Sequence, residues 1–186
     1  MARPLTLTDE QILALVGDSL DQTGSSWTLA RAADAAGLHP STLIKRFGSR
    51  HGLLVALSRR WIESIPIGAT TPHAHSELLN WAASQTIDQV GTALLMARLD
   101  MLIEDFHDDE LRDLLHKGWT KHSAYLSDLV QRCQDSGEIA SHLQAEAIAL
   151  FLLDSAHGAL LRAAVHPVPS EVDPGRALTV ILEYLK

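Results

Sequence analysis

Apolar residues recur along most of this chain at the three- and four-residue spacing of amphipathic helices. Near the N-terminus, Ile12, Val16 and Leu20 lie four residues apart and share one helical face. Alternation of apolar and polar residues never extends beyond a few positions, so β-strands are not expected. The pattern predicts an all-α protein of about nine helices, at residues 8–22, 28–36, 40–47, 50–65, 76–89, 91–106, 109–135, 142–165 and 174–185.

Side chains suited to helix ends mark several of these boundaries. Hydroxyl or carboxylate groups stand at four expected helix starts, namely Thr8, Thr28, Ser49 and either Asp108 or Asp109. Thr8 is followed three residues later by Gln11, the spacing of a capping box. Pro66 ends the helix over 50–65, and residues 66–75 are rich in proline, glycine and small side chains. This segment predicts a loop that separates two helical parts.

Two short helices joined by a tight turn are expected within residues 28–54. Gly37 stands where the first helix must end on a residue that tolerates positive φ. Three alanines on the inner face of that helix allow the next helix to cross closely, as in a helix-turn-helix. The second helix and its first turn then carry residues suited to base edges and phosphates: His39, Pro40, Ser41, Thr42, Lys45 and Arg46. An ordinary helical hairpin with a solvated basic face fits the same pattern.

The stretch from Gly37 to Leu54 resembles the DNA-binding motif of the TetR family of bacterial transcriptional regulators. The matching positions are Gly37, Leu38, Thr42, Leu43, Phe47, Ser49, Arg50, Leu53 and Leu54. Two positions depart from the family pattern, because Ile44 replaces the usual tyrosine and His39 replaces a serine-like cap. Lys45 and Arg46 can replace the phosphate contact that the tyrosine would make.

This resemblance implies a helix-turn-helix DNA-binding domain over residues 1–48. It implies a ligand-binding and dimerisation domain over residues 49–186, in which the helix at 49–65 connects the two parts. In the head it implies phosphate contacts from Lys45, Arg46 and Arg50. The remaining residues of the implied DNA-binding surface are Thr28, His39, Pro40, Ser41 and Thr42.

The distribution of charge agrees with a DNA-binding head. The whole chain has a formal net charge of −8. Residues 1–60 nevertheless contain seven Lys or Arg against five Asp or Glu, whereas the remaining residues contain eight against 18. A mildly basic head on an acidic body suits a protein that presents one end to DNA. The N-terminal arm carries only Arg3, so a minor-groove contact from this arm is not expected.

Aromatic, sulfur-containing and histidine side chains recur in the second part of the chain. The resemblance implies an effector pocket between the helices that follow the head. The side chains that can line it are Trp61, Trp81, Met96, Met101, Phe106, Trp119, His122 and Tyr125. Their composition suits a largely apolar small molecule of unknown identity, although most of these rings also suit an ordinary core.

The helix from Leu143 to Val165 is apolar nearly all round, which requires burial on two sides. The resemblance implies that the last two helices pair with those of a second copy in a four-helix bundle. The expected contacts of this homodimer are Phe151, Leu152, Ser155, Gly158, Ala159, Arg162, Leu178 and Leu182. The central helix of a monomer is the alternative. Because Asp154, His157 and Arg162 interrupt the apolar run, a membrane span is not expected.

Several other classes of function lack support in the sequence. His116 and His122 are six residues apart and do not share a helical face, and no carboxylate or cysteine completes a metal site. No cofactor loop or nucleophile motif is present, so neither a cofactor nor an enzymatic activity is expected. The single cysteine, Cys133, excludes an intramolecular disulfide and suits the cytoplasm. The N-terminus lacks the apolar core of a signal peptide.

These observations predict a ligand-responsive transcriptional regulator. The expected form is a repressor that binds a palindromic operator as a homodimer and is released by a small-molecule inducer. The alternative is a helical module for ligand sequestration or protein interaction that keeps the fold without binding an operator. The acidic total charge, the poor N-terminal arm and Ile44 favour this alternative.

Overall fold

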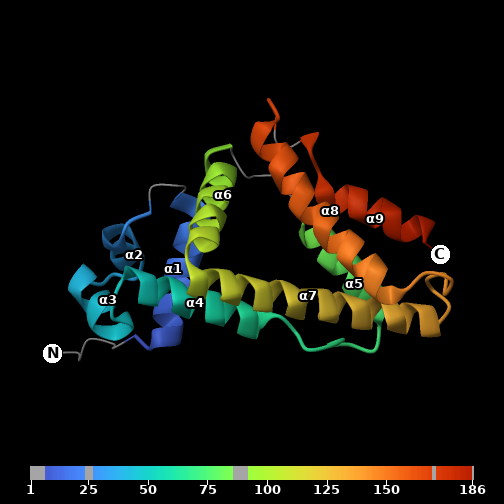
Figure 1. Cartoon of the computed structure of the whole chain (residues 1–186), viewed down its shortest axis with the longest axis horizontal. Helices are drawn as coiled ribbons and strands as arrows, with labels where there is room; N and C mark the ends of the chain where they lie inside the picture. The colour runs from blue at the N-terminus through green and yellow to red at the C-terminus, as the bar shows by residue number, and fades with distance from the viewer. Residues whose placement is uncertain (1–6, 24–26, 86–91, 169–170, 186) are drawn as a thin grey trace.

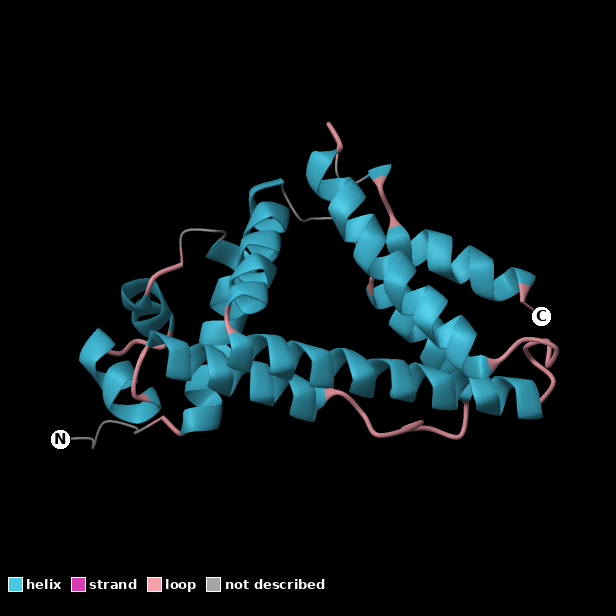
Figure 2. Ribbon diagram, in the orientation of Figure 1, coloured by secondary structure: helices cyan, strands magenta, loops and turns pink. Residues whose placement is uncertain are grey.

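The computed structural model describes residues 7–23, 27–85, 92–168 and 171–185. These residues form helices and connecting turns, without a strand (Figures 1 and 2). The helices are α1 (Asp9–Thr23), α2 (Leu29–Ala35), α3 (Pro40–Phe47), α4 (Arg50–Ser64), α5 (Ala74–Ser84), α6 (Thr92–His107), α7 (Asp109–Asp135), α8 (Ala145–Val165) and α9 (Pro174–Tyr184). The predicted all-α class and the predicted order of helices are confirmed.

Helix starts follow the capping groups of the sequence. The Thr8 N–H donates to Gln11 Oε1 at 2.9 Å, and the Gln11 N–H donates to Thr8 Oγ1 at 3.2 Å, which confirms the capping box. The side chains of Thr28, Ser49 and Asp108 each accept a backbone N–H three residues on, at 3.0–3.2 Å. Each bond satisfies a donor that the first turn of a helix leaves unpaired.

Helices α1 to α4 pack into a head at one end of the molecule (Figure 1). Ile12 of α1, Ala33 of α2 and Leu43 of α3 are fully buried there. The same core also contains Leu53 of α4 and Leu111 of α7, which are 0% and 1% exposed. The head is therefore completed by residues that lie beyond position 48.

The body is built on α7, a helix of 27 residues and thus about 40 Å long. Helices α5 and α8 pack on the half of α7 that lies away from the head, and α9 packs on α5 and α8 (Figure 1). Fully buried residues of this second core are Leu78 of α5, Leu126 and Leu129 of α7, Leu152 of α8 and Leu182 of α9. One long helix thus contributes to both hydrophobic cores.

Helices α6 and α8 rise from opposite ends of α7 and incline toward each other (Figures 1 and 2). Leu95 near the start of α6 packs on Ala163 and Ala164 near the end of α8. The three helices therefore form a triangle, with α7 as its base.

A few helix limits differ from the prediction. Helix α8 begins at Ala145 rather than at residue 142, because the preceding chain turns and the Ala140 N–H donates to the Leu185 carbonyl at 2.7 Å. Helix α5 ends at Ser84. The expected helix end at residue 89 and the expected stop at Gly24 lie outside the described residues.

Helix α8 has the length and apolar composition that a membrane span requires. It packs against α7 and α9, and 44% of its most apolar window is buried inside the protein. It also contains Asp154 and Arg162. We therefore assign α8 to the core of the body.

Candidate functional site

The turn between α2 and α3 has the geometry of a helix-turn-helix. Gly37 adopts a positive φ of 63°, and its N–H donates to the Asp34 carbonyl at 3.0 Å. The Leu38 N–H donates to the Ala33 carbonyl at 2.8 Å. Because Ala33 is small and Leu43 is fully buried, α3 crosses close to α2. The outer face of α3 is left uncovered.

Helix α3 presents polar and apolar groups on this outer face. Ser41, Ile44 and Lys45 are exposed, and Thr42 is half-buried. His39 is the N-cap, because its Nδ1 accepts the Ser41 N–H at 3.3 Å and lies 2.8 Å from the Ser41 hydroxyl. Ile44 was not among the predicted contacts, although it is 47% exposed beside Lys45. Its position next to Lys45 in the sequence could have identified it as a candidate DNA contact.

The two arginines predicted to bind phosphate have partners within the chain. Arg46 forms an ion pair with Asp9 at 2.5 Å and donates to the Leu7 carbonyl at 2.6 Å, which ties α3 to the start of α1. Arg50 donates two hydrogen bonds to Glu104 of α6 and lies 4.2 Å above the Trp27 ring. Among the predicted phosphate contacts, Lys45 is therefore the exposed cation without such a pair in the described part of the chain.

Ion pairs join the start of α4 to the junction of α6 and α7. The Arg50 hydrogen bond lowers the pKa of the Glu104 carboxyl and raises that of the guanidinium. His51 Nε2 lies 3.2 Å from Asp108, which also caps α7. Arg59 pairs with Glu110 at 3.2 Å. Each solvent-exposed pair adds little stability on its own. Together the pairs join α4 to α6 and to the start of α7.

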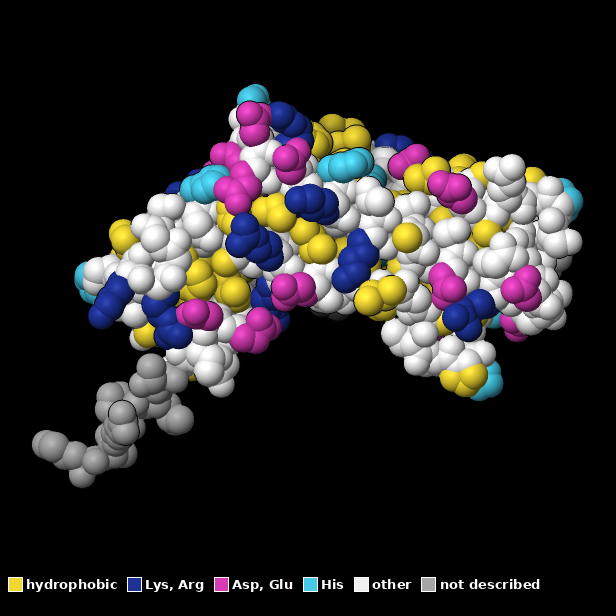
Figure 3. All heavy atoms as spheres, turned by 60° about the horizontal axis from the view of Figure 1, so that its bottom comes forward, with side chains coloured by type: hydrophobic (Ala, Val, Ile, Leu, Met, Phe, Trp, Pro, Cys, Tyr) yellow, Lys and Arg dark blue, Asp and Glu magenta, His cyan; other side chains and the backbone are white. Residues whose placement is uncertain are grey.

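On the visible face of the described part of the head, basic side chains do not form a continuous patch (Figure 3). On the face shown in Figure 3, Lys and Arg side chains are interspersed with acidic and apolar ones. This agrees with the small excess of positive charge in the first 60 residues.

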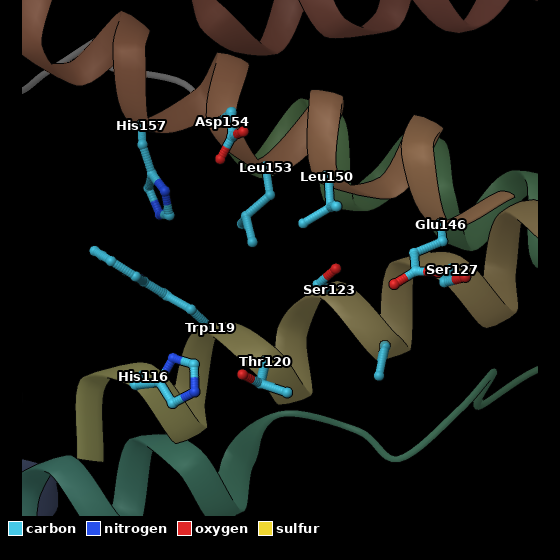
Figure 4. A pocket seen from close by; sticks show the side chains of 11 residues that line it. His116, Trp119, Thr120, Ser123, Ser127, Glu146, Leu150, Leu153, Asp154 and His157 are labelled. Atoms are coloured by element: carbon cyan, nitrogen blue, oxygen red, sulfur yellow. The ribbon is translucent and has the colours of Figure 1, made fainter. Parts of the chain in front are cut away.

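The largest cavity described in the structure lies between α7 and α8 and has a volume of about 740 Å³ (Figure 4). Helix α7 contributes His116, Trp119, Thr120, Ser123, Ala124 and Ser127 to its wall. Helix α8 contributes Glu146, Leu150, Leu153, Asp154 and His157. Its size lies within the range of small-molecule sites, which is roughly 300–1,000 Å³.

The Trp119 ring lies between His116 and His157 in this cavity (Figure 4). Its centroid is 5.2 Å from that of the His157 imidazole. Burial lowers the pKa of His157, and the nearby Asp154 carboxylate opposes this shift only in part. The His157 side chain is therefore neutral at neutral pH.

Trp119 also lines a second cavity of about 410 Å³ between the head and the body. This junction cavity is bounded by Asp18 of α1, Leu57 and Trp61 of α4, and Asp105 of α6. Burial, followed by the charges of neighbouring acids, raises the pKa of Asp105 to about 6. One indole therefore separates the main cavity from a space that the head also borders.

The eight residues predicted to bind the effector do not come together in one pocket. Only Trp119 lines the main cavity. Trp61, Trp81, His122 and Tyr125 line a separate hollow of about 500 Å³. In that hollow the Trp81 indole N–H donates to His122 Nε2 at 2.8 Å, and the Tyr125 hydroxyl donates to Glu77 at 2.8 Å. These polar groups already have partners within the chain, and their hollow is separate from the main cavity.

The other predicted ligand residues lie elsewhere. Met101 faces the junction cavity. Met96 and Phe106 are 44% and 45% exposed, and neither lines a cavity described above. Phe106 packs edge-on against Trp119, with 6.4 Å between ring centroids.

Polar residues of α8 that sequence reasoning passed over line the main cavity instead. Glu146, Asp154 and His157 share one helical face with Leu150 and Leu153, at spacings of three and four residues. In the sequence analysis Asp154 and His157 were treated only as interruptions of an apolar run, and Glu146 was not considered. The spacing of three and four residues, which places them on one helical face, could have identified them as a group.

The predicted dimer contacts also separate into two groups. Leu152 and Leu182 are fully buried within the subunit and cannot reach a partner, which corrects their assignment. Ala159 and Leu178 are 2% and 1% exposed and form the floor of a groove between α8 and α9. Its walls include the remaining predicted residues Ser155, Gly158 and Arg162, while Phe151 is 54% exposed on the same helix.

The described residues contain no group of three or more His, Cys, Asp or Glu side chains placed to hold a metal ion. Cys133, the single cysteine, is buried, and burial raises the pKa of its thiol to about 11.

A helix-turn-helix head on a helical body defines the class of helix-turn-helix transcriptional regulators. The sequence profile of the BetI-type transcriptional repressor C-terminal domain matches residues 81–186, more than half of the chain. The chain therefore belongs to the TetR family of transcriptional regulators. Members of this family are transcription factors, so the protein is not an enzyme. A comparison with curated protein sequences finds no match.

Solved structures share this fold along nearly the whole chain. A TetR transcription regulator from Haloarcula marismortui is 20% identical with a TM-score of 0.71, over 94% of this chain and 95% of that one. Reduced NemR from Escherichia coli is 18% identical with a TM-score of 0.67, over 95% and 96%. A transcriptional regulator from Saccharomonospora viridis, solved in complex with choline, is 15% identical with a TM-score of 0.67, over 94% and 95%. At these identities the likeness concerns the fold.

Proposed function

We propose that this protein is a cytoplasmic repressor that binds a palindromic operator as a homodimer and leaves it when a small molecule binds. The observation that carries the proposal is the link between two sites. The uncovered face of α3 lies in the head, while Trp119 of the main cavity also borders the junction between head and body. A ligand that displaces Trp119 changes the packing around α4 and thereby the position of α3.

Contacts to DNA are proposed for the outer face of α3. Lys45 is an exposed cation of this face that has no ion pair within the described residues, and Ser41 and Thr42 supply hydroxyl groups for base edges or phosphates. Ile44 supplies an exposed apolar group, which suits a thymine methyl. The helix has eight residues and enters the groove from its His39 end.

A homodimer is proposed because a two-fold protein can place two α3 helices on two half-sites. Uncovered apolar side chains of α8 and α9 support this assembly. They include Phe151 at 54%, Val165 at 83% and Val180 at 41% exposure. A patch of this kind commonly marks an interaction surface.

A small-molecule effector is supported by the size of the main cavity and by its position between two body helices. The neighbour solved with choline supports the same role for the body. In the proposed mechanism, effector binding favours a separation of the two heads that no longer matches the half-sites of the operator.

The test is fluorescence anisotropy of the full chain on a labelled duplex from the intergenic DNA beside its gene, with a scrambled duplex as competitor. Lys45→Ala should weaken binding to every sequence and reduce the slope of log K against log salt by about one. The matched control is Arg132→Ala, which removes a cation at the far end of α7. It should leave the salt slope unchanged. An unchanged slope for Lys45→Ala would remove this lysine from the interface.

A second function, ligand sequestration without operator binding, is favoured by the internal partners of Arg46 and Arg50. If these pairs persist in solution, neither arginine is available to a phosphate. Equal binding of the intergenic and scrambled duplexes, or no binding to either, would support this alternative and contradict the repressor.

A further inference from the structure

We infer that the main cavity selects an organic cation that carries an apolar group. This inference rests on the proposed function, because it assigns a chemical class to the effector of the same cavity. The argument uses the charges of the cavity wall, the partners of those charges and the aromatic side chain opposite them.

Acidic groups dominate the charge of the wall. Glu146 and Asp154 line the cavity, whereas no Lys or Arg is found among the lining residues that the structure describes. Neither carboxylate has an ion pair within the described part of the chain. Burial keeps His157 neutral at neutral pH, so this ring does not offset them. An anionic ligand would be repelled, and a neutral one would take water from the carboxylates without replacing it.

The two carboxylates flank an apolar strip on α8. They are eight residues apart, which corresponds to about 12 Å along the helix axis. Leu150 and Leu153 lie between them and point into the cavity (Figure 4). A ligand can therefore place a positive group near one carboxylate while its apolar part packs on the leucines.

Trp119 provides an aromatic surface at the Asp154 end. Its indole lies across the cavity from Asp154 and beside His157 (Figure 4). Tryptophan is the aromatic side chain that attracts cations most strongly, and quaternary ammonium groups are bound in this way. A cation held between Trp119 and Asp154 would also contact the ring that separates this cavity from the junction with the head.

The test uses two probes of equal shape that differ in charge. Phenyltrimethylammonium carries a quaternary nitrogen where tert-butylbenzene carries a carbon. Calorimetry with the full chain should show at least tenfold tighter binding of the cation, and benzoate should not bind. Equal or tighter binding of tert-butylbenzene, measured up to its solubility in water, would overturn the inference, as would the absence of binding by phenyltrimethylammonium at millimolar concentration.

Variants of the wall connect this preference to particular residues. Asp154→Asn should weaken binding of phenyltrimethylammonium by about five- to tenfold, because it removes the partly solvated charge beside the expected position of the cation. Glu146→Gln removes a charge about 12 Å farther along the helix and should weaken binding by less than about twofold. Both side chains are exposed to solvent, so the fold should persist. The matched control is Glu183→Gln on α9, which lines none of the cavities described and should bind as the parent does. Unchanged affinity in Asp154→Asn would overturn the inference.

Anisotropy of the DNA complex separates this inference from the proposed function. Tight binding of the cation without release of DNA would support the cavity assignment and contradict the repressor mechanism. Release of DNA by tert-butylbenzene but not by the cation would support the repressor and contradict the cationic effector.

Discussion

Gly118 marks the closest contact between α4 and α7. It is buried, and a Cβ atom added at this position would overlap the ring of Trp61. The indole of Trp61 therefore lies directly against the α7 backbone. Glycine is required here by the close approach of the two helices, since its φ is not in the left-handed region.

Replacement of Gly118 by alanine should destabilise the protein by about 1–3 kcal/mol, because the Trp61 ring must move out of a packed position. Thermal unfolding measures the effect. The control is Gly17→Ala in α1, where the nearest side-chain atoms to an added Cβ are 4.0 Å away. This change should instead raise stability by about 0.5–1 kcal/mol through helix propensity. Equal effects of the two substitutions would contradict the close contact.

Helix α8 has three faces with different surroundings. One face, with Ala149 and Leu152, packs in the body core. A second lines the main cavity through Leu153 and Asp154. A third carries Phe151 and remains uncovered in the single subunit. Because all three faces carry apolar residues, the helix has little amphipathicity.

A change on the uncovered face should affect assembly rather than folding. Phe151→Glu should convert the proposed dimer to a monomer in size-exclusion chromatography with light scattering at micromolar concentration, because it places a charge in an apolar interface. The helical circular dichroism should not change, since the side chain is 54% exposed. Ile103→Glu, at a 50% exposed position on α6, is the control and should remain a dimer. A dimer that survives Phe151→Glu would place the interface elsewhere.

Local features were predictable, and distant pairings were not. The helix limits and the turn at Gly37 follow from caps and spacing within a few residues. The ion pair of Arg50 with Glu104 joins positions 54 residues apart, and no local pattern indicates it. The spacing of the polar residues marked one face of α8, but local periodicity could not show which neighbour each face would meet. Leu152 was therefore assigned to the dimer contact, and Asp154 was not assigned to the cavity.

The pair between Arg50 and Glu104 connects the head to the body of the molecule. It neutralises a cation at the start of α4, close to the expected path of the DNA backbone. It also holds α4 against α6. In the proposed complex, DNA and Glu104 therefore compete for one guanidinium.

Glu104→Gln should free Arg50 for a phosphate and strengthen DNA binding several-fold, with a steeper salt dependence. The loss of a partly exposed pair should cost no more than about 1 kcal/mol of stability. Anisotropy at several salt concentrations measures the first effect, and thermal unfolding the second. The control is Glu110→Gln, which removes the surface partner of Arg59. Weaker DNA binding by Glu104→Gln would mean that the pair instead holds the head in its binding position.

The two ends of α7 belong to different hydrophobic cores, with Leu111 in that of the head and Cys133 in that of the body. A chimera that exchanges heads between regulators by splicing at residue 48 would therefore combine a new head with foreign partners on α4 and α7. A splice boundary that keeps the head core intact is discontinuous in sequence, because α4 and the first turns of α7 must be transferred together with the head. Sensors built from this chain should be recombined along that boundary.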